Sequence, residues 1–170
     1  MKLRLFAVLF GAAVIHAAPV AGEGWFSRGI DIEQSQKVAI ALEQGVAACL
    51  DVPLAYRPDC TGYAFRQATR QIDNNADYWE ADVALTRVVR KTERLVLSMK
   101  DNSAERLRHD GFRLRAVTSP VGAMAFVRET VVEAAGQMET LSPYEKRLLA
   151  PIFAALDTVA RQLSGDGPSS

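Results

Sequence analysis

The amino-acid sequence predicts an all-α fold, a bundle of four to five helices stapled by one disulfide and preceded by a cleaved signal peptide. Three observations lead to this prediction. Apolar residues recur at spacings of three and four in five segments, which is the period of an amphipathic helix. A basic, then apolar, then small-residue leader opens the chain. Two cysteines stand where the first helical segment gives way to the second.

The five helical segments cover residues 31–50, 58–73 and 76–100, followed by two that begin at Pro120 and Pro143. Proline and aspartate at 51–53 end the first, because the residue before a proline avoids helical geometry. The predicted apolar stripes comprise Val38, Ala41, Leu42, Val46, Ala47, Tyr63, Phe65, Ala68, Leu85, Val88, Thr92, Leu95, Met99, Met124, Val127, Val131, Ala135, Met138, Leu148, Leu149, Ile152, Phe153, Leu156, Val159 and Leu163.

The last two helices carry start signals. Ser119 and Ser142 each offer a cap hydroxyl, and each is followed by proline, which suits the first helical position. Glu145 completes a capping box with Ser142. Pro151 predicts a kink inside the final helix. Residues 101–118 break the helical pattern and fit a short strand, a loop or a broken helix.

The leader is the basis for predicting export. Lys2 and Arg4 precede the uninterrupted apolar run from Leu5 to Ile15, and small residues surround Ala17 to Gly22. Eleven apolar residues are too few for a membrane anchor, which needs about 20. We therefore expect residues 1–22 to be a signal peptide and the mature protein to be periplasmic or secreted, with no stable membrane anchor. Residues 23–164 form the predicted single helical domain and residues 165–170 a disordered tail.

The two cysteines, Cys49 and Cys60, fit an oxidising compartment. An even pair in an exported chain indicates a disulfide, and this one would join the end of the first helix to the start of the second. A metal site would need further Cys or His ligands, and His109 is the one histidine after the leader. We therefore predict a structural disulfide, with no metal and no cofactor.

Sequence motifs for catalysis fail at required positions. A nucleophile needs a base, and His109 stands beside Asp110-Gly111 in a predicted turn, away from any Gly-x-Ser-x-Gly elbow. Residues 73–77 resemble the opening of a calcium loop, but Tyr78 replaces its glycine and Ala84 its bidentate glutamate. These failures favour a non-catalytic role.

The distribution of charge offers the main positive signal for function. Residues 87–115 hold nine basic and four acidic side chains, whereas residues 23–86 hold five basic and ten acidic ones. Either the two regions pair with each other or form a solvated face, or the basic region steers a charged partner. If the basic region steers a partner, the partner-binding residues are those of the irregular segment, Arg106, Arg108, Arg113 and Arg115.

The resulting functional hypothesis is an exported binding, adaptor or assembly-accessory protein that recognises an envelope protein or another periplasmic macromolecule. The near-neutral total charge argues against nucleic acid as the partner. Two alternatives stay open. One is a cell-wall glycoside hydrolase that uses Glu80 and Asp82 beside Tyr78 and Trp79. The other is a bundle that binds a small apolar ligand, with a lining of Met99, Met124, Met138 and Phe153.

Overall fold

A computed structural model describes residues 32–164 of the chain, so the predicted signal peptide and tail lie outside the described residues. The described part consists mainly of five α-helices joined by short 3₁₀ turns and one hairpin. Its first half contains α1 (Ile32–Leu50), η1 (Leu54–Tyr56), α2 (Arg57–Thr69), η2 (Ala76–Tyr78) and α3 (Trp79–Ser98).

The second half begins with the segment that the sequence left open between strand, loop and broken helix. It forms the strands β1 (Leu107–His109) and β2 (Phe112–Leu114), which pair with each other. Helix α4 (Pro120–Gly136), the 3₁₀ turn η3 (Gln137–Thr140) and helix α5 (Pro143–Ser164) follow. The all-α prediction is therefore confirmed for the bundle, with a two-stranded hairpin added to it.

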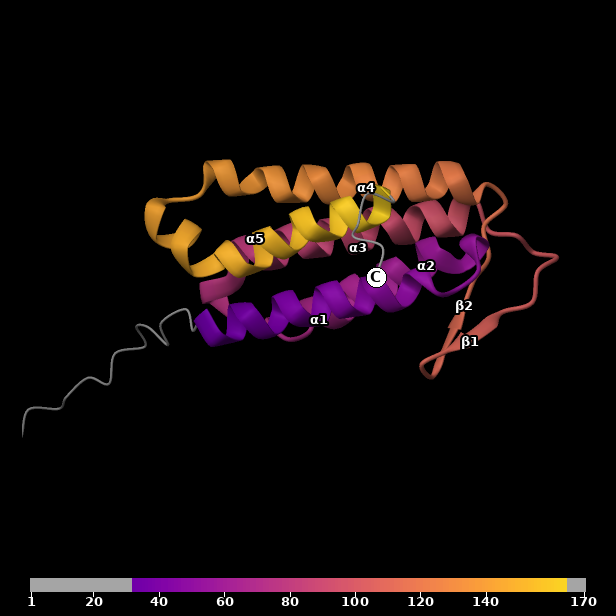
Figure 1. Cartoon of the computed structure of the whole chain (residues 1–170), viewed down its shortest axis with the longest axis horizontal. Coiled ribbons are helices and arrows are strands. Elements are labelled where there is room, and N and C mark those ends of the chain that lie inside the picture. Colours follow the sequence, from indigo (N-terminus) through magenta and orange to yellow (C-terminus); the bar gives the residue numbers. More distant parts are fainter. Residues whose placement is uncertain (1–31, 165–170) are drawn as a thin grey trace, which may run out of the picture.

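The helices pack side by side along the long axis of the molecule, and the hairpin extends from one end (Figure 1). Helix α1 packs against α2 and α5, α3 lies between α2 and α4, and α4 completes the circuit by packing on α5. One cluster of buried side chains includes residues from all five helices. Its largest fully buried members include Phe65, Leu85 and Phe153.

Most of the predicted apolar stripe forms this core. Sixteen of its members are buried, namely Val38, Leu42, Val46, Phe65, Ala68, Leu85, Val88, Thr92, Met124, Val127, Val131, Leu149, Ile152, Phe153, Leu156 and Val159. Ala47 is exposed, which corrects its assignment to the core. The reason is geometric, since Val46 and Cys49 already occupy the buried face of α1 on that turn.

The two predicted helix caps behave differently. The capping box of α5 is confirmed, because the amide of Ser142 donates to the Glu145 carboxylate at 2.9 Å and the Glu145 amide donates to the Ser142 hydroxyl at 3.3 Å. The hydroxyl of Ser119 makes no capping hydrogen bond, so that prediction was wrong. Its backbone, at ψ 77°, departs from the extended conformation in which a cap hydroxyl reaches the first amides.

The boundaries of α2 and α3 also differ from the sequence pattern. Helix α2 ends at Thr69 instead of continuing to residue 73, and Asn74 adopts a left-handed backbone with φ 61°. Asn75 then accepts a hydrogen bond from the Asp77 amide at 3.2 Å and caps η2, which leads into α3. Asparagine tolerates this conformation because its short polar side chain bonds locally.

The predicted disulfide joins Cys49 at the end of α1 to Cys60 in the first turns of α2. Both cysteines are buried in the core cluster. The bond therefore fixes the angle at which the chain reverses between the two helices, and η1 fills the short connection.

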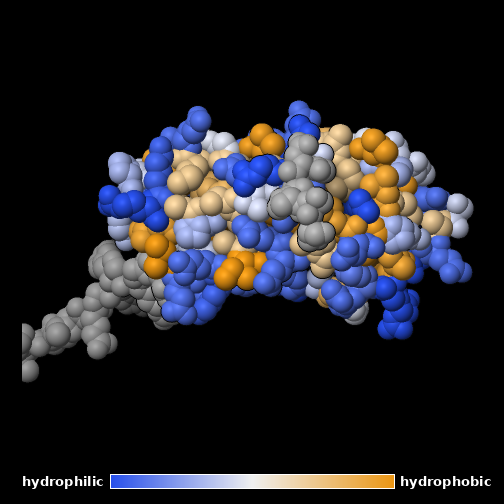
Figure 2. All heavy atoms as spheres, viewed as in Figure 1, coloured by the Kyte–Doolittle hydropathy of each residue, from blue (hydrophilic) through white to orange (hydrophobic). Residues whose placement is uncertain are grey.

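The surface in Figure 2 mixes polar and apolar side chains. Hydrophilic residues gather along the lower edge over α1, while hydrophobic ones are interspersed over α4 and α5. Exposed apolar side chains on α4 include Val121 and Val132. Within residues 32–164, no helix combines the length and apolar character needed to cross a membrane.

We expect removal of the disulfide by Cys49→Ser and Cys60→Ser together to lower the melting temperature by about 10 °C. The cross-link limits the unfolded chain, and closing a loop this short is worth about 3 kcal/mol. Thermal unfolding followed by circular dichroism, with and without a reductant, measures the effect. A wild-type melting temperature unchanged by full reduction would contradict it.

Candidate functional site

The hairpin owes its shape to the dipeptide at its tip. Asp110 and Gly111 have φ values of 46° and 82°, so both central residues of the two-residue turn are left-handed. This is the backbone of a type I′ turn, which Asp-Gly favours and which matches the twist of the flanking strands. The turn signal was visible in the sequence, but the strands it joins are only three residues long.

The strand register brings two of the predicted partner-binding arginines together. Arg108 lies directly opposite Arg113 in the antiparallel pair, and both side chains are exposed. Directly opposite residues have Cβ atoms about 5 Å apart, and like charges in this position are destabilising. Arg106, just before β1, is also exposed. We call Arg106, Arg108 and Arg113 the hairpin arginines.

The other face of the hairpin packs on the bundle. Leu114 is buried in the core cluster, and Leu107 and Phe112 pack against that cluster. The ring of Phe112 is in contact with the ring of Tyr63 on α2. This alternation of apolar and basic residues fixes the direction of the hairpin arginines, because successive side chains in a strand point to opposite faces.

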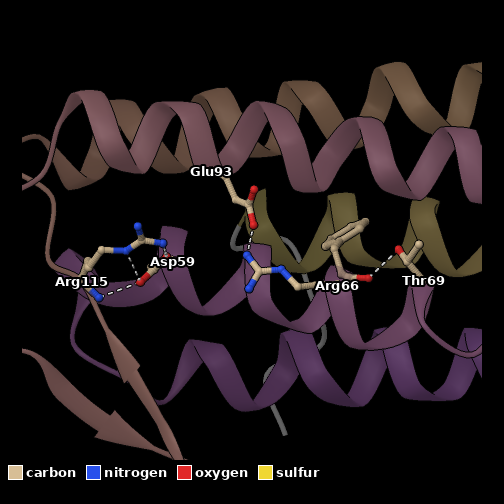
Figure 3. Close-up of polar contacts among 6 residues, drawn as sticks. Asp59, Arg66, Thr69, Glu93 and Arg115 are labelled. Atoms are coloured by element: carbon tan, nitrogen blue, oxygen red, sulfur yellow. Dashed lines mark hydrogen bonds and ion pairs between the residues drawn. The ribbon is translucent and has the colours of Figure 1, made fainter.

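Arg115 does not join the hairpin arginines, which corrects its predicted availability to a partner. Its guanidinium donates to the Asp59 carboxylate at 2.8 Å and 3.1 Å, and its backbone amide donates to the same group at 2.7 Å (Figure 3). The hydrogen bond with Asp59 raises the pKa of Arg115 above its usual range, against the opposing effect of burial. This ion pair ties the base of β2 to the first turn of α2.

Further hydrogen bonds to the backbone hold both ends of the hairpin segment. The Tyr56 hydroxyl donates to the carbonyl of Glu105 at 2.7 Å, and the Val117 amide donates to the carbonyl of Ala55 at 2.9 Å. At the end of α3, the Thr118 amide donates to the carbonyl of Met99 at 2.8 Å. The hairpin arginines therefore stand on a platform attached to η1, α2 and α3.

We expect Arg115→Gln to lower the free energy of unfolding by about 2 kcal/mol, because Asp59 would stay largely buried without its ionic partner. Arg113→Gln, two residues away on the exposed face, is the matched control and should not destabilise the protein. Chemical denaturation of the two variants compares them. An equal loss of unfolding free energy in the two variants would show that the Arg115–Asp59 pair contributes no more to stability than an exposed arginine does.

A second basic feature follows the outward face of α3. A surface groove of about 520 Å³ runs along this helix toward α4, and we call it the α3 groove. Its lining residues are Trp79, Asp82, Val83, Thr86, Arg87, Arg90, Lys91, Arg94 and Glu133. The sequence shows that these basic residues belong to the positively charged region 87–115, but not that they share a hollow.

Some of these charges are already paired. Lys91 bonds to Glu133 across the groove from α3 to α4. Outside the groove, Arg66 on α2 bonds to Glu93 on α3 (Figure 3). The hydrogen bond from Lys91 lowers the pKa of Glu133, and the charges of Lys91 and Arg87 add to this effect. A general acid needs the opposite shift at neutral pH, so Glu133 is suited to ion pairing.

The residues of the hydrolase hypothesis are not brought together. Tyr78 is fully buried at 1% exposure, whereas Trp79 is 63% exposed. Asp82 lines the α3 groove and Glu80 does not. His109 is the last residue of β1, beside the turn, and its Nε2 is 3.5 Å from the Asp110 carboxylate. No group of three or more metal-ligating side chains occurs among residues 32–164.

The residues of the apolar-ligand hypothesis are also divided. Met138 and Phe153 border a surface hollow of about 530 Å³ at the junction of α4 and α5. Met99 packs instead on a separate buried cluster formed by Val96, Val117 and Ala123. The four predicted lining residues therefore do not share one cavity.

Comparisons with known proteins add no assignment: no family model, characterised protein or solved structure shows a significant match to the chain.

Proposed function

We propose that this chain is an exported, non-catalytic binding protein that recognises an acidic surface of an envelope protein through the hairpin arginines. The observation that carries the proposal is the register of the hairpin, which sets Arg108 directly opposite Arg113 on an exposed face. Export follows from the leader sequence, and an oxidising compartment accords with the Cys49–Cys60 disulfide.

A cross-strand pair of like charges works against the fold. Neither arginine makes a hydrogen bond or ion pair with any other residue in the described part of the chain. A carboxylate brought by a partner would relieve the repulsion, and an arginine fork can bind it through two parallel hydrogen bonds. Proteins typically keep such locally unfavourable residue pairs, in a fold that is otherwise well packed and paired, at their binding sites.

The platform beneath the arginines favours binding for a second reason. Binding normally loses affinity when it must order loops and side chains. Here the backbone is already fixed by the Asp59–Arg115 pair, the Tyr63–Phe112 contact and the buried Leu114. Only the side chains of the hairpin arginines would have to become ordered on contact.

We expect Arg113→Glu to weaken partner binding at least tenfold while raising the free energy of unfolding by about 0.5 kcal/mol. The new carboxylate would face Arg108 and convert a repulsive cross-strand pair into an attractive one. Affinity capture from an envelope fraction, quantified by mass spectrometry, measures binding, and chemical denaturation measures stability.

Arg128→Glu combined with Arg147→Glu is the control, because both residues are exposed and lie on α4 and α5, away from the hairpin. This double variant should capture the same partner as the wild type. Capture should also fall as salt rises toward 0.5 M, since exposed charges are screened (Debye length about 10 Å at 0.1 M). Undiminished capture by Arg113→Glu would refute the proposal.

A further inference from the structure

The α3 groove continues beyond its main hollow. A second hollow of about 320 Å³ between α2 and α3 shares Asp82, Thr86 and Arg90 with it. A third, at the turn before η2, shares Trp79 and Asp82. Together they form a continuous depression that crosses the outward face of α3 from the side of α2 to the side of α4. An elongated ligand therefore has several adjoining subsites.

We propose that this depression binds an acidic saccharide, at a site separate from the hairpin arginines. Three kinds of side chain support this ligand class. The cations Arg90 and Arg94 are exposed and make no hydrogen bond or ion pair with other residues of the described region, so they are free to bind a carboxylate. Arginine recognises carboxylates through paired hydrogen bonds.

The second element is aromatic. The indole of Trp79 is 63% exposed at the start of α3, where it borders both the main hollow and the third one. An exposed indole beside polar groups can cover the apolar face of a ligand while its N–H finds a hydrogen-bond partner. The C–H face of a sugar ring is such a ligand surface.

The third element is a set of acceptors. Asp82 and Thr86 line both the main hollow and the second one, and the Thr86 hydroxyl donates to the Asp82 carboxylate at 3.2 Å. Sugar hydroxyls need acceptors as well as donors. Phosphate groups along a polyphosphate chain offer acceptor oxygens and no donor, so they could not bond to the Asp82 carboxylate as a sugar hydroxyl can. The mixture of free arginines, an indole and carboxylates therefore favours an acidic sugar over a nucleic acid.

The experiment uses the purified protein with Trp25→Phe, so that Trp79 is the one tryptophan that reports binding. Hexasaccharides from hyaluronan, alginate and polygalacturonate are the acidic probes, chitohexaose is the neutral probe and a thymidine hexanucleotide is the phosphate probe. Tryptophan fluorescence and isothermal titration calorimetry measure each dissociation constant. We expect at least one acidic hexasaccharide to bind about tenfold or more tightly than chitohexaose.

Variants locate the site. Arg90→Gln with Arg94→Gln should weaken acidic saccharide binding about tenfold or more, and Trp79→Ala should do the same in calorimetry. Arg128→Gln with Arg147→Gln is the matched control and should bind like the wild type, as should Arg113→Glu in the hairpin. Melting curves confirm that each variant folds.

The proposal is overturned if none of the acidic probes binds, if chitohexaose binds equally well, or if the hexanucleotide binds more tightly than every saccharide. Saccharide binding that survives the loss of Arg90 and Arg94 would also overturn it. None of these results bears on the hairpin proposal, whose test uses a protein partner and different variants.

Discussion

The close packing of α2 between its neighbours is the constraint on which the rest of the structure depends. A Cβ atom on Gly62 would lie 2.9 Å from Cγ2 of the buried Thr92 on α3, so a larger residue would force the two helices or Thr92 to move. On the other side, a Cβ on Gly45 of α1 would lie 3.0 Å from that of Ala64. The disulfide joins α1 and α2 where the chain passes from the end of the first helix to the start of the second. With α2 fixed in this way, its first turn presents Asp59 to Arg115, directly after the second strand of the hairpin.

The charge asymmetry of the sequence has two separate outcomes in the fold. Part of it is used internally, because Arg115 from the basic region pairs with Asp59 from the acidic one. The remainder stays at the surface, where Arg108 and Arg113 face each other and Arg90 and Arg94 follow α3. The two interpretations of the charge pattern therefore apply to different residues, and a single substitution at 113 or 115 would report on different properties. This division explains how a nearly neutral chain carries two local basic surfaces.

The sequence was sufficient to predict the helices, the core and the disulfide, because hydrophobic periodicity and cysteine spacing are local signals. It could not predict the hairpin register, since three-residue strands leave too short an alternation and the Asp110-Gly111 turn alone does not define its flanks. The role of Arg115 depends on a contact with Asp59, 56 positions earlier in the chain, which no local pattern contains. The sequence did not predict the α3 groove for the same reason, because Glu133 of α4 lines one side of it and residues of α2 line the adjoining hollow.

In the proposed binding role, α2 holds the hairpin in its final conformation before a partner arrives. Amide hydrogen exchange across residues 107–115, in the wild type and in Asp59→Asn, tests it most directly. We expect slow exchange at the Arg115 amide in the wild type, because that amide donates to Asp59, and faster exchange there and in both strands in the variant. The core amides of α1 and α5 should stay protected in both proteins. Wild-type exchange in the hairpin as fast as that of the exposed loop at 102–103 would contradict the account.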